Sequence, residues 1–274
     1  MKRPTVALIY DFDGTLSPAN MQEFGLLQAF DKDPALFWQK SNRMSTDNDA
    51  SEILCYMKTM TDEAKKAGIH LTRENFQKFG SMVKLYPGVK EWFSLINDYG
   101  SQCGLEVEHY INSSGLTEMI EGTEIYHEFK KVFACSFLYE NGEAVWPRVA
   151  VDYTAKTQFL FKINKGVMSI RDHTLVNRFV LEKDRPVPFS RMIYFGDGAT
   201  DIPCMRLVKE FGGHSIAVYN PDGHEKDKSE RLLTEQRVHF ACPADYSKGK
   251  IIYNVVTAII DKIKADLAVE SLKE

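Results

Sequence analysis

The chain has 274 residues and a formal net charge of -4, with 44% hydrophobic and 26% charged residues. This length suits one large domain or two unequal ones, and the composition is that of an ordinary globular protein. The slight negative charge gives no electrostatic reason to expect nucleic acid or an anionic membrane as a partner.

Two further features favour a reducing cytoplasmic compartment. Five cysteines are scattered without a CxxC pair, which argues against a disulfide framework and against a zinc site. No apolar run approaches the roughly 18 residues of a membrane span, and Met1 to Pro4 lead into an apolar strand rather than into a signal peptide. We therefore expect a cytoplasmic protein without a membrane partner.

The first apolar run, Val6 to Tyr10, is short and is followed directly by Asp11 and Asp13. Its length, its β-branched residues and the breakers Gly14 and Pro18 predict a buried strand. Open α/β sheets bind ligands beyond the carboxyl ends of their strands, which makes these two carboxylates candidates for chemistry. An isolated Asp-x-Asp pair is more often part of a turn, so the remaining motifs decide between the two readings.

Residues 18–85 have helical spacing, and we predict a four-helix cap domain inserted into a Rossmann-like core of residues 1–17 and 86–274. Asp33-Pro34 predicts an N-cap followed by proline at the first helical position, and a third helix is expected from about Asp49 to Gly68. The apolar stripes of these helices are most simply core. Three charged residues of this segment are weak candidates for substrate contacts, with surface solvation the simpler reading of each: Glu23, Arg43 and Lys58.

The rest of the chain alternates strands with helices, which predicts an α/β fold with a doubly wound, mainly parallel sheet. Asn141-Gly142 indicates a β-hairpin, and residues 167–190 fit no clear pattern. The expected strands span residues 105–111, 131–139, 144–146, 192–195, 215–219 and 238–241, and the expected helices span 89–97, 116 onward, 154–166, 202 onward and about 249 onward.

Polar groups follow several of these strands. Carboxylates gathered at one edge of a sheet repel each other unless a cation lies between them, and hard oxygen ligands suit Mg²⁺. Lysine and serine are suited to hold a phosphate dianion beside that metal. The predicted phosphoryl site comprises Asp11, Asp13, Ser113, Lys156, Asp197 and Asp201.

The order of these motifs resembles the haloacid dehalogenase superfamily, and most closely its phosphoserine phosphatase-like branch, which carries a helical cap between the first two motifs. The resemblance covers the whole chain. It departs from the family pattern in the long stretch between Lys156 and Asp197 and in a loosely matched second motif. The matching segments are Asp11-Phe-Asp13-Gly-Thr15, Ser113-Ser-Gly-Leu, Lys156-Thr-Gln-Phe-Leu-Phe-Lys-Ile and Gly196-Asp197-Gly-Ala-Thr-Asp201.

Each residue type suggests a role in that chemistry. Asp11, kept ionised by metal and lysine, would be the nucleophile that attacks phosphorus in line. Asp13 would be the general acid toward the leaving oxygen and then the base toward water. The resemblance implies that Mg²⁺ is held by Asp11, Asp13 and Asp197, with Asp201 in support, and that the phosphoryl oxygens are held by Ser113, Lys156, Gly14 and Thr15.

These residues predict a Mg²⁺-dependent phosphatase that hydrolyses a small phosphomonoester through an aspartyl phosphate. Two alternatives stay open: a phosphotransferase or phosphomutase, and a catalytically silent binding module with the same fold. Ser114 is an alternative to Ser113, and Lys165, at the far end of its helix, is expected to be a solvated charge. The sequence does not indicate the substrate or the oligomeric state.

Overall fold

The computed structural model describes residues 3–223 and 226–272, and its centre is a seven-stranded sheet with the strand order β4-β3-β2-β1-β5-β6-β7. All neighbouring strands pair in parallel except β3 and β4, so the predicted α/β fold with a mainly parallel sheet is confirmed. The strands are β1 Thr5–Tyr10, β2 Glu106–Leu116, β3 Lys131–Glu140, β4 Glu143–Val149, β5 Met192–Gly196, β6 His214–Tyr219 and β7 Phe240–Pro243.

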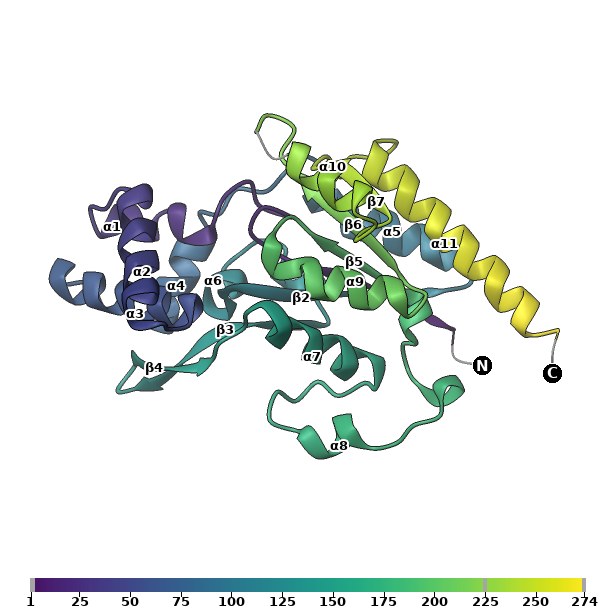
Figure 1. The fold of residues 1–274 in the computed structure, drawn as a ribbon, viewed down its shortest axis with the longest axis horizontal. Coiled ribbons are helices and arrows are strands. Elements are labelled where there is room, and N and C mark those ends of the chain that lie inside the picture. The colour runs from purple at the N-terminus through teal and green to yellow at the C-terminus, as the bar shows by residue number, and fades with distance from the viewer. Residues whose placement is uncertain (1–2, 224–225, 273–274) are drawn as a thin grey trace.

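Helices cover both sides of this sheet, as the near-continuous apolar run of its central strand requires. Every residue of β1 is buried, which is typical of a parallel strand with helices on both faces. In Figure 1, α7 and α9 lie in front of the sheet and α5 lies behind it. The helices of this part are α5 Val89–Gln102, α6 Thr117–Glu121, α7 Tyr153–Asn164, α8 His173–Asn177, α9 Ile202–Glu210, α10 Lys226–Thr234 and α11 Ile251–Glu270.

The segment after β1 forms a separate group of helices at one end of the molecule (Figure 1). The Asp33 side chain accepts a hydrogen bond from the backbone N–H of Leu36, so it caps its helix as predicted. The next helix begins later than expected, because Asp49 ends α2 in the left-handed conformation and Ser51 is the N-cap of α3. The helices are α1 Leu26–Ala29, α2 Pro34–Asn48, α3 Glu52–Ala67 and α4 Arg73–Gly80. The division of the chain into cap and core at residues 18 and 85 stays a prediction.

Two strand boundaries differ from those predicted. Strand β2 does not end at Ile111 but continues through the serine motif to Leu116, with an irregular register against β3 between Asn112 and Leu116. The expected strand at 238–241 lies instead at Phe240–Pro243. The hairpin prediction is confirmed: Asn141 and Gly142 both have positive φ, as the tight turn between β3 and β4 requires.

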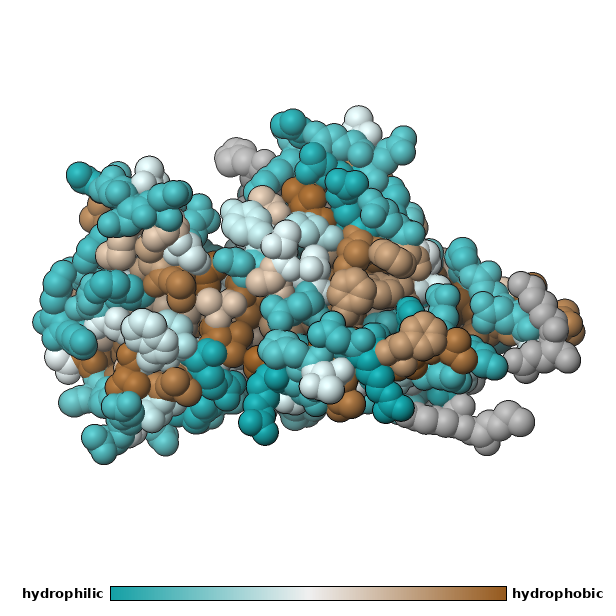
Figure 2. Space-filling model, turned by 60° about the horizontal axis from the view of Figure 1, so that its bottom comes forward, coloured by the Kyte–Doolittle hydropathy of each residue, from teal (hydrophilic) through white to brown (hydrophobic). Residues whose placement is uncertain are grey.

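Residues 167–190, which fit no sequence pattern, form an irregular crossover that contains the short helix α8. The prediction that Lys165 is merely solvated was wrong, because its Nζ donates hydrogen bonds to the carbonyls of Val176 and Arg178, at 2.6 and 2.7 Å. Figure 2 shows a largely hydrophilic face with separate hydrophobic patches. Within the described ranges, no helix combines the length and apolar character that crossing a bilayer requires.

Candidate active site

A cavity of about 480 Å³ lies beyond the carboxyl ends of β1, β2 and β5, where a parallel sheet is expected to bind ligands. One wall comes from these strand ends and the loops after them. The other wall comes from the helical segment after β1. The lining residues are Asp11, Asp13, Gly14, Pro18, Ala19, Asn20, Gln22, Glu23, Trp38, Ile53, Tyr56, Ser113, Ser114, Gly115, Asp197, Gly198, Ala199 and Thr200.

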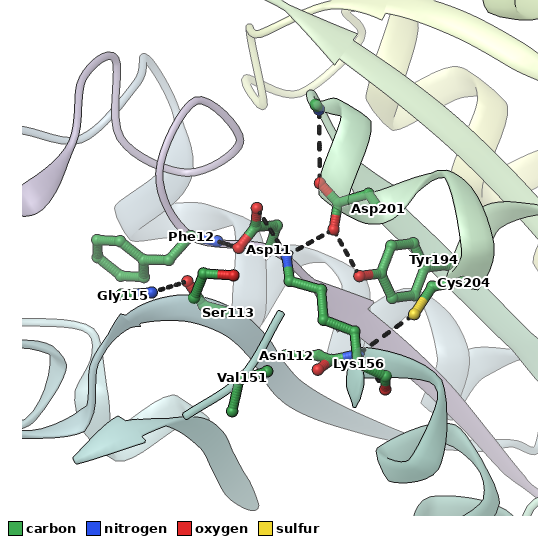
Figure 3. Close-up of polar contacts among 12 residues, drawn as sticks. Asp11, Phe12, Asn112, Ser113, Gly115, Val151, Lys156, Tyr194, Asp201 and Cys204 are labelled. Carbon is green, nitrogen blue, oxygen red and sulfur yellow. Dashed lines mark hydrogen bonds and ion pairs between the residues drawn. The ribbon is translucent and has the colours of Figure 1, made fainter. Parts of the chain in front are cut away.

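Asp11 is held in a defined orientation at the end of β1. Its backbone N–H donates to the carbonyl of Phe195 on β5, at 2.9 Å, which continues the strand pairing up to the site. One side-chain oxygen, Oδ1, accepts a hydrogen bond of 2.8 Å from the backbone N–H of Phe12, and Oδ2 lies 3.0 Å from Lys156 Nζ (Figure 3). The carboxylate is therefore fixed by two donors while it still lines the cavity.

Lys156 is fully buried on α7, which excludes a role as a surface charge. Its Nζ lies between Asp11, at 3.0 Å, and Asp201 Oδ1, at 2.8 Å (Figure 3). Burial alone would lower the pKa of this lysine, but the charges of Asp11 and Asp201 outweigh burial and raise it above its usual value. Lys156 thus places a positive charge between two carboxylates behind the cavity. Tyr194 completes the arrangement by donating a 2.7 Å hydrogen bond to Asp201 Oδ1.

Three carboxylates from two parts of the chain meet here. One oxygen from each of Asp11, Asp197 and Asp201 lies within 4.8 Å of the others. Gly14 allows this approach, since a Cβ at its position would lie 2.2 Å from Asp197 Oδ2, and its φ of +74° favours glycine. Asp201 Oδ1 already accepts hydrogen bonds from Lys156 and Tyr194. Asp201 is therefore suited to orient Lys156. Asp11 and Asp197 provide the hard oxygen donors that fit Mg²⁺.

Asp13 lies beside this cluster and also lines the cavity. Its Oδ1 accepts a 2.8 Å hydrogen bond from the backbone N–H of Met21. Burial, followed by the charge of Asp11, raises the pKa of Asp13 well above its usual value, although the Met21 hydrogen bond and Lys156 oppose the shift. Gly115 leaves the space for this arrangement, since a Cβ there would lie 2.1 Å from the Met21 methyl group. A carboxyl group in this environment can carry a proton.

Not all of the remaining predicted phosphate ligands line the cavity. Ser113 and Ser114 both line the cavity. Ser113 Oγ accepts a 3.0 Å hydrogen bond from the Gly115 N–H, whereas Ser114 Oγ is buried and finds no hydrogen-bond partner among the described residues. Gly14 lines the cavity, but Thr15 is fully buried and is not part of its wall. The choice between the two serines therefore stays open.

Of the three charged residues predicted as weak candidates for substrate contacts, one lies at the cavity. Glu23 lines the cavity, but Arg43 and Lys58 do not; they pair on the surface with Asp47 and Asp62. Sequence reasoning missed Trp38 and Tyr56 as cavity residues and Tyr194 as the partner of Asp201, since each reads as a core aromatic. The helical spacing that predicts burial carries no signal for which buried ring faces a cavity.

Comparison with known proteins supports the same fold. No family model matches the sequence. A protein of Borreliella burgdorferi described as uncharacterized is 28% identical over 278 residues, covering 91% of this chain and 94% of that protein. A solved structure of a substrate-bound phosphoserine phosphatase is 14% identical and superposes with a TM-score of 0.55, over 88% of this chain and 93% of that one.

Two further solved structures are similar at low identity. A haloacid dehalogenase (HAD) family hydrolase from Salmonella enterica serovar Typhi is 13% identical, with a TM-score of 0.59 over 94% of this chain and 72% of that one. A probable phosphoserine phosphatase from Vibrio cholerae is 13% identical, with a TM-score of 0.57 over 98% of this chain and 67% of that one. The chain therefore shares the α/β fold of these phosphoserine phosphatase and HAD family hydrolase structures.

Proposed function

We propose that the protein is a Mg²⁺-dependent phosphatase that hydrolyses a small phosphomonoester through a covalent intermediate on Asp11. The observation that carries this proposal is the buried Lys156 cation between Asp11 and Asp201, at 3.0 and 2.8 Å, beside a cluster of carboxylates that opens on the cavity. Such an arrangement holds the Asp11 carboxylate at the cavity wall, where it can attack a bound phosphate. Similar solved structures include proteins titled as phosphoserine phosphatases.

In the first half-reaction, an Asp11 carboxylate oxygen attacks phosphorus and forms an acyl phosphate bond as the bond to the ester oxygen breaks. Asp13 gives its proton to the leaving alkoxide, which departs as an alcohol. Lys156 holds Asp11 throughout, and Ser113 or Ser114 donates to a phosphoryl oxygen. Losing one such donor typically lowers the rate by about 10² to 10³.

In the second half-reaction, the Asp13 carboxylate takes a proton from water, and the water oxygen attacks phosphorus. The acyl phosphate bond breaks, which releases inorganic phosphate and restores the Asp11 carboxylate. Asp11 and Asp197, with the backbone carbonyl of Asp13, would hold Mg²⁺. When bound, this ion neutralises the converging carboxylates and withdraws charge from the phosphoryl oxygens. We propose that residues 18–85 close over the cavity and keep bulk water out.

Hydrolysis of p-nitrophenyl phosphate tests this proposal. We expect the purified protein to release p-nitrophenol and inorganic phosphate in equal amounts with Mg²⁺ and to lose this activity when the metal is chelated. Absence of hydrolysis under both conditions would favour the catalytically silent module. p-Nitrophenol release without an equal amount of phosphate, with the phosphoryl group on an added alcohol, would favour the phosphotransferase.

Replacing Asp13 by Asn is expected to affect substrates according to their leaving groups. Alkyl phosphates need a proton on the departing oxygen, so their rate of enzyme phosphorylation should fall by about 10² to 10⁴, the range for general acid catalysis. p-Nitrophenolate leaves without a proton, so its release in the first turnover should be much less impaired. Rapid-mixing measurements of the two substrate types check this, and equal losses for both would contradict the role of Asp13.

A further inference from the structure

The cavity wall contributed by the helical segment has a distinct chemistry. Glu23 is its charged residue, and Trp38 and Tyr56 are its aromatic residues. Glu23 belongs to the 3₁₀ turn after β1, Trp38 to α2 and Tyr56 to α3, so three separate elements bring these side chains to one wall. Neither the phosphatase chemistry nor the metal cluster uses any of them.

The Glu23 carboxylate is held in place rather than left to solvent. Its Oε1 accepts hydrogen bonds from Trp38 Nε1, at 3.0 Å, and from Asn20 Nδ2, at 2.7 Å. Both donors are neutral, so they orient the carboxylate without neutralising its charge. Glu23 therefore presents a fixed negative charge to the wall of the cavity opposite the phosphoryl site.

The two rings form a corner beside this carboxylate. Trp38 and Tyr56 lie with ring centroids 5.8 Å apart at an interplanar angle of 62°. The Tyr56 hydroxyl donates a 2.8 Å hydrogen bond to the carbonyl of Ser114, which ties the corner to the phosphate-binding strand. Two rings at an angle next to a carboxylate are suited to bind an alkylammonium group, because the face of an aromatic ring has a negative electrostatic potential and the carboxylate has a negative charge.

The charge balance of the cavity points the same way. Asp11, Asp13, Glu23 and Asp197 line it, and among the described lining residues none is a lysine, an arginine or a histidine. The buried Lys156 and a bound Mg²⁺ would serve the phosphoryl group. Glu23 then has no cation within the cavity wall, and a substrate carboxylate would find no positive side chain to meet it.

We propose that this wall selects phosphomonoesters of amino alcohols, with the substrate's ammonium group between Glu23, Trp38 and Tyr56 and no carboxylate on the substrate. This inference rests on the proposed phosphatase activity and narrows its substrate class. A substrate of this kind carries its positive charge on the side of the cavity where the protein places a negative one. Its phosphoryl group lies at the other side, next to the metal and to Asp11, which Lys156 supports from behind.

Four phosphates of primary alcohols test the proposal: phosphocholine, phosphoethanolamine, the uncharged isostere 3,3-dimethylbutyl phosphate and the carboxylate-bearing 3-phosphoglycerate. We expect kcat/KM for the better ammonium substrate to exceed that for the uncharged isostere by about 10-fold to 100-fold, the range of a charge-assisted contact. The carboxylate should be the poorest substrate. A preference for phosphocholine would show that the rings contribute more to recognition of the ammonium group. A preference for phosphoethanolamine would show that Glu23 contributes more.

The Glu23→Gln variant removes the charge and keeps an acceptor for Trp38. We expect it to erase most of the preference over the isostere, chiefly by raising KM for the ammonium substrates. Glu74→Gln, which removes an exposed carboxylate from α4 outside the cavity wall, should preserve the preference. If Glu23→Gln does not fold, Trp38→Leu should reduce the phosphocholine preference by about 3-fold to 30-fold.

Three results would overturn the inference while the phosphatase proposal stands, two of them from the substrate series. One is equal kcat/KM for the ammonium substrates and the uncharged isostere, and the other is a preference for 3-phosphoglycerate. The inference would also fail if Glu23→Gln left the preference intact. Absence of hydrolysis of all four substrates and of p-nitrophenyl phosphate would instead refute the phosphatase activity itself.

Discussion

The Asp11→Asn variant is expected to lose phosphatase activity, with kcat lowered by on the order of 10⁴-fold or more. Removing a covalent nucleophile disables a machinery whose parts act as a unit, which gives losses of this order in other enzymes. The neutral amide keeps the size of the side chain and can still accept from the Phe12 N–H, so the fold should persist. Steady-state hydrolysis of p-nitrophenyl phosphate, with circular dichroism to check folding, measures this effect.

Asp47→Asn is the matched control, because it makes the same chemical change at an exposed residue of α2. Asp47 forms an ion pair with Arg43 on the surface, away from the cavity. The activity of this variant should stay close to that of the unaltered protein. Retention of more than a few per cent of activity by Asp11→Asn would contradict the assignment of the nucleophile, since amide groups do not attack phosphorus at a comparable rate.

Replacing Lys156 by Met is expected to lower both stability and activity. The fully buried cation separates Asp11 from Asp201, and its loss leaves two carboxylates with uncompensated charge. Removing one partner of a buried ion pair typically costs about 3 to 5 kcal/mol in the free energy of unfolding. Activity should fall by about 10² to 10³ or more, because Asp11 loses a donor that orients it. Denaturant unfolding without divalent cations and p-nitrophenyl phosphate kinetics check the two effects.

Two comparisons separate the structural effect of Lys156 from its chemical effect. Adding Asp201→Asn to Lys156→Met removes one of the stranded charges, so the double variant should regain part of the stability but none of the activity. Lys165→Met alters another lysine at the end of the same helix, where Nζ binds carbonyls of the crossover. It should retain activity. A Lys156→Met variant as active as Lys165→Met would refute the role assigned to Lys156.

Much of the architecture was predictable because it depends on local signals. Apolar runs that end in carboxylates indicated the central strands, and the Asp33-Pro34 cap and the Asn141-Gly142 turn are local hydrogen-bonding and φ preferences. Residue types also indicated that Asp11, Lys156 and Asp201 belong together. Their distances confirm that these side chains meet, although their chemical roles stay proposals.

Other features depend on tertiary contacts that the sequence pattern does not encode. The serine motif continues β2 instead of ending it, because pairing with β3 resumes at Leu116 after an irregular stretch. Lys165 resembles an ordinary helix-end charge, yet it is held by carbonyls from the crossover. Thr15 follows Gly14 directly but is fully buried and does not line the cavity. Trp38 and Tyr56 have the periodicity of core residues, and only the packing of α2 against α3 brings them to the cavity.

The central claim is that Asp11 takes up the phosphoryl group, and acid trapping tests it most directly. The protein is mixed with a ³²P-labelled phosphomonoester and Mg²⁺, quenched in acid within the first turnover, digested and sequenced by mass spectrometry. The account predicts an acid-stable, hydroxylamine-sensitive label on the peptide that contains Asp11, and no label in Asp11→Asn. Full hydrolytic activity with the label on another residue, or with none at any quench time, would contradict it.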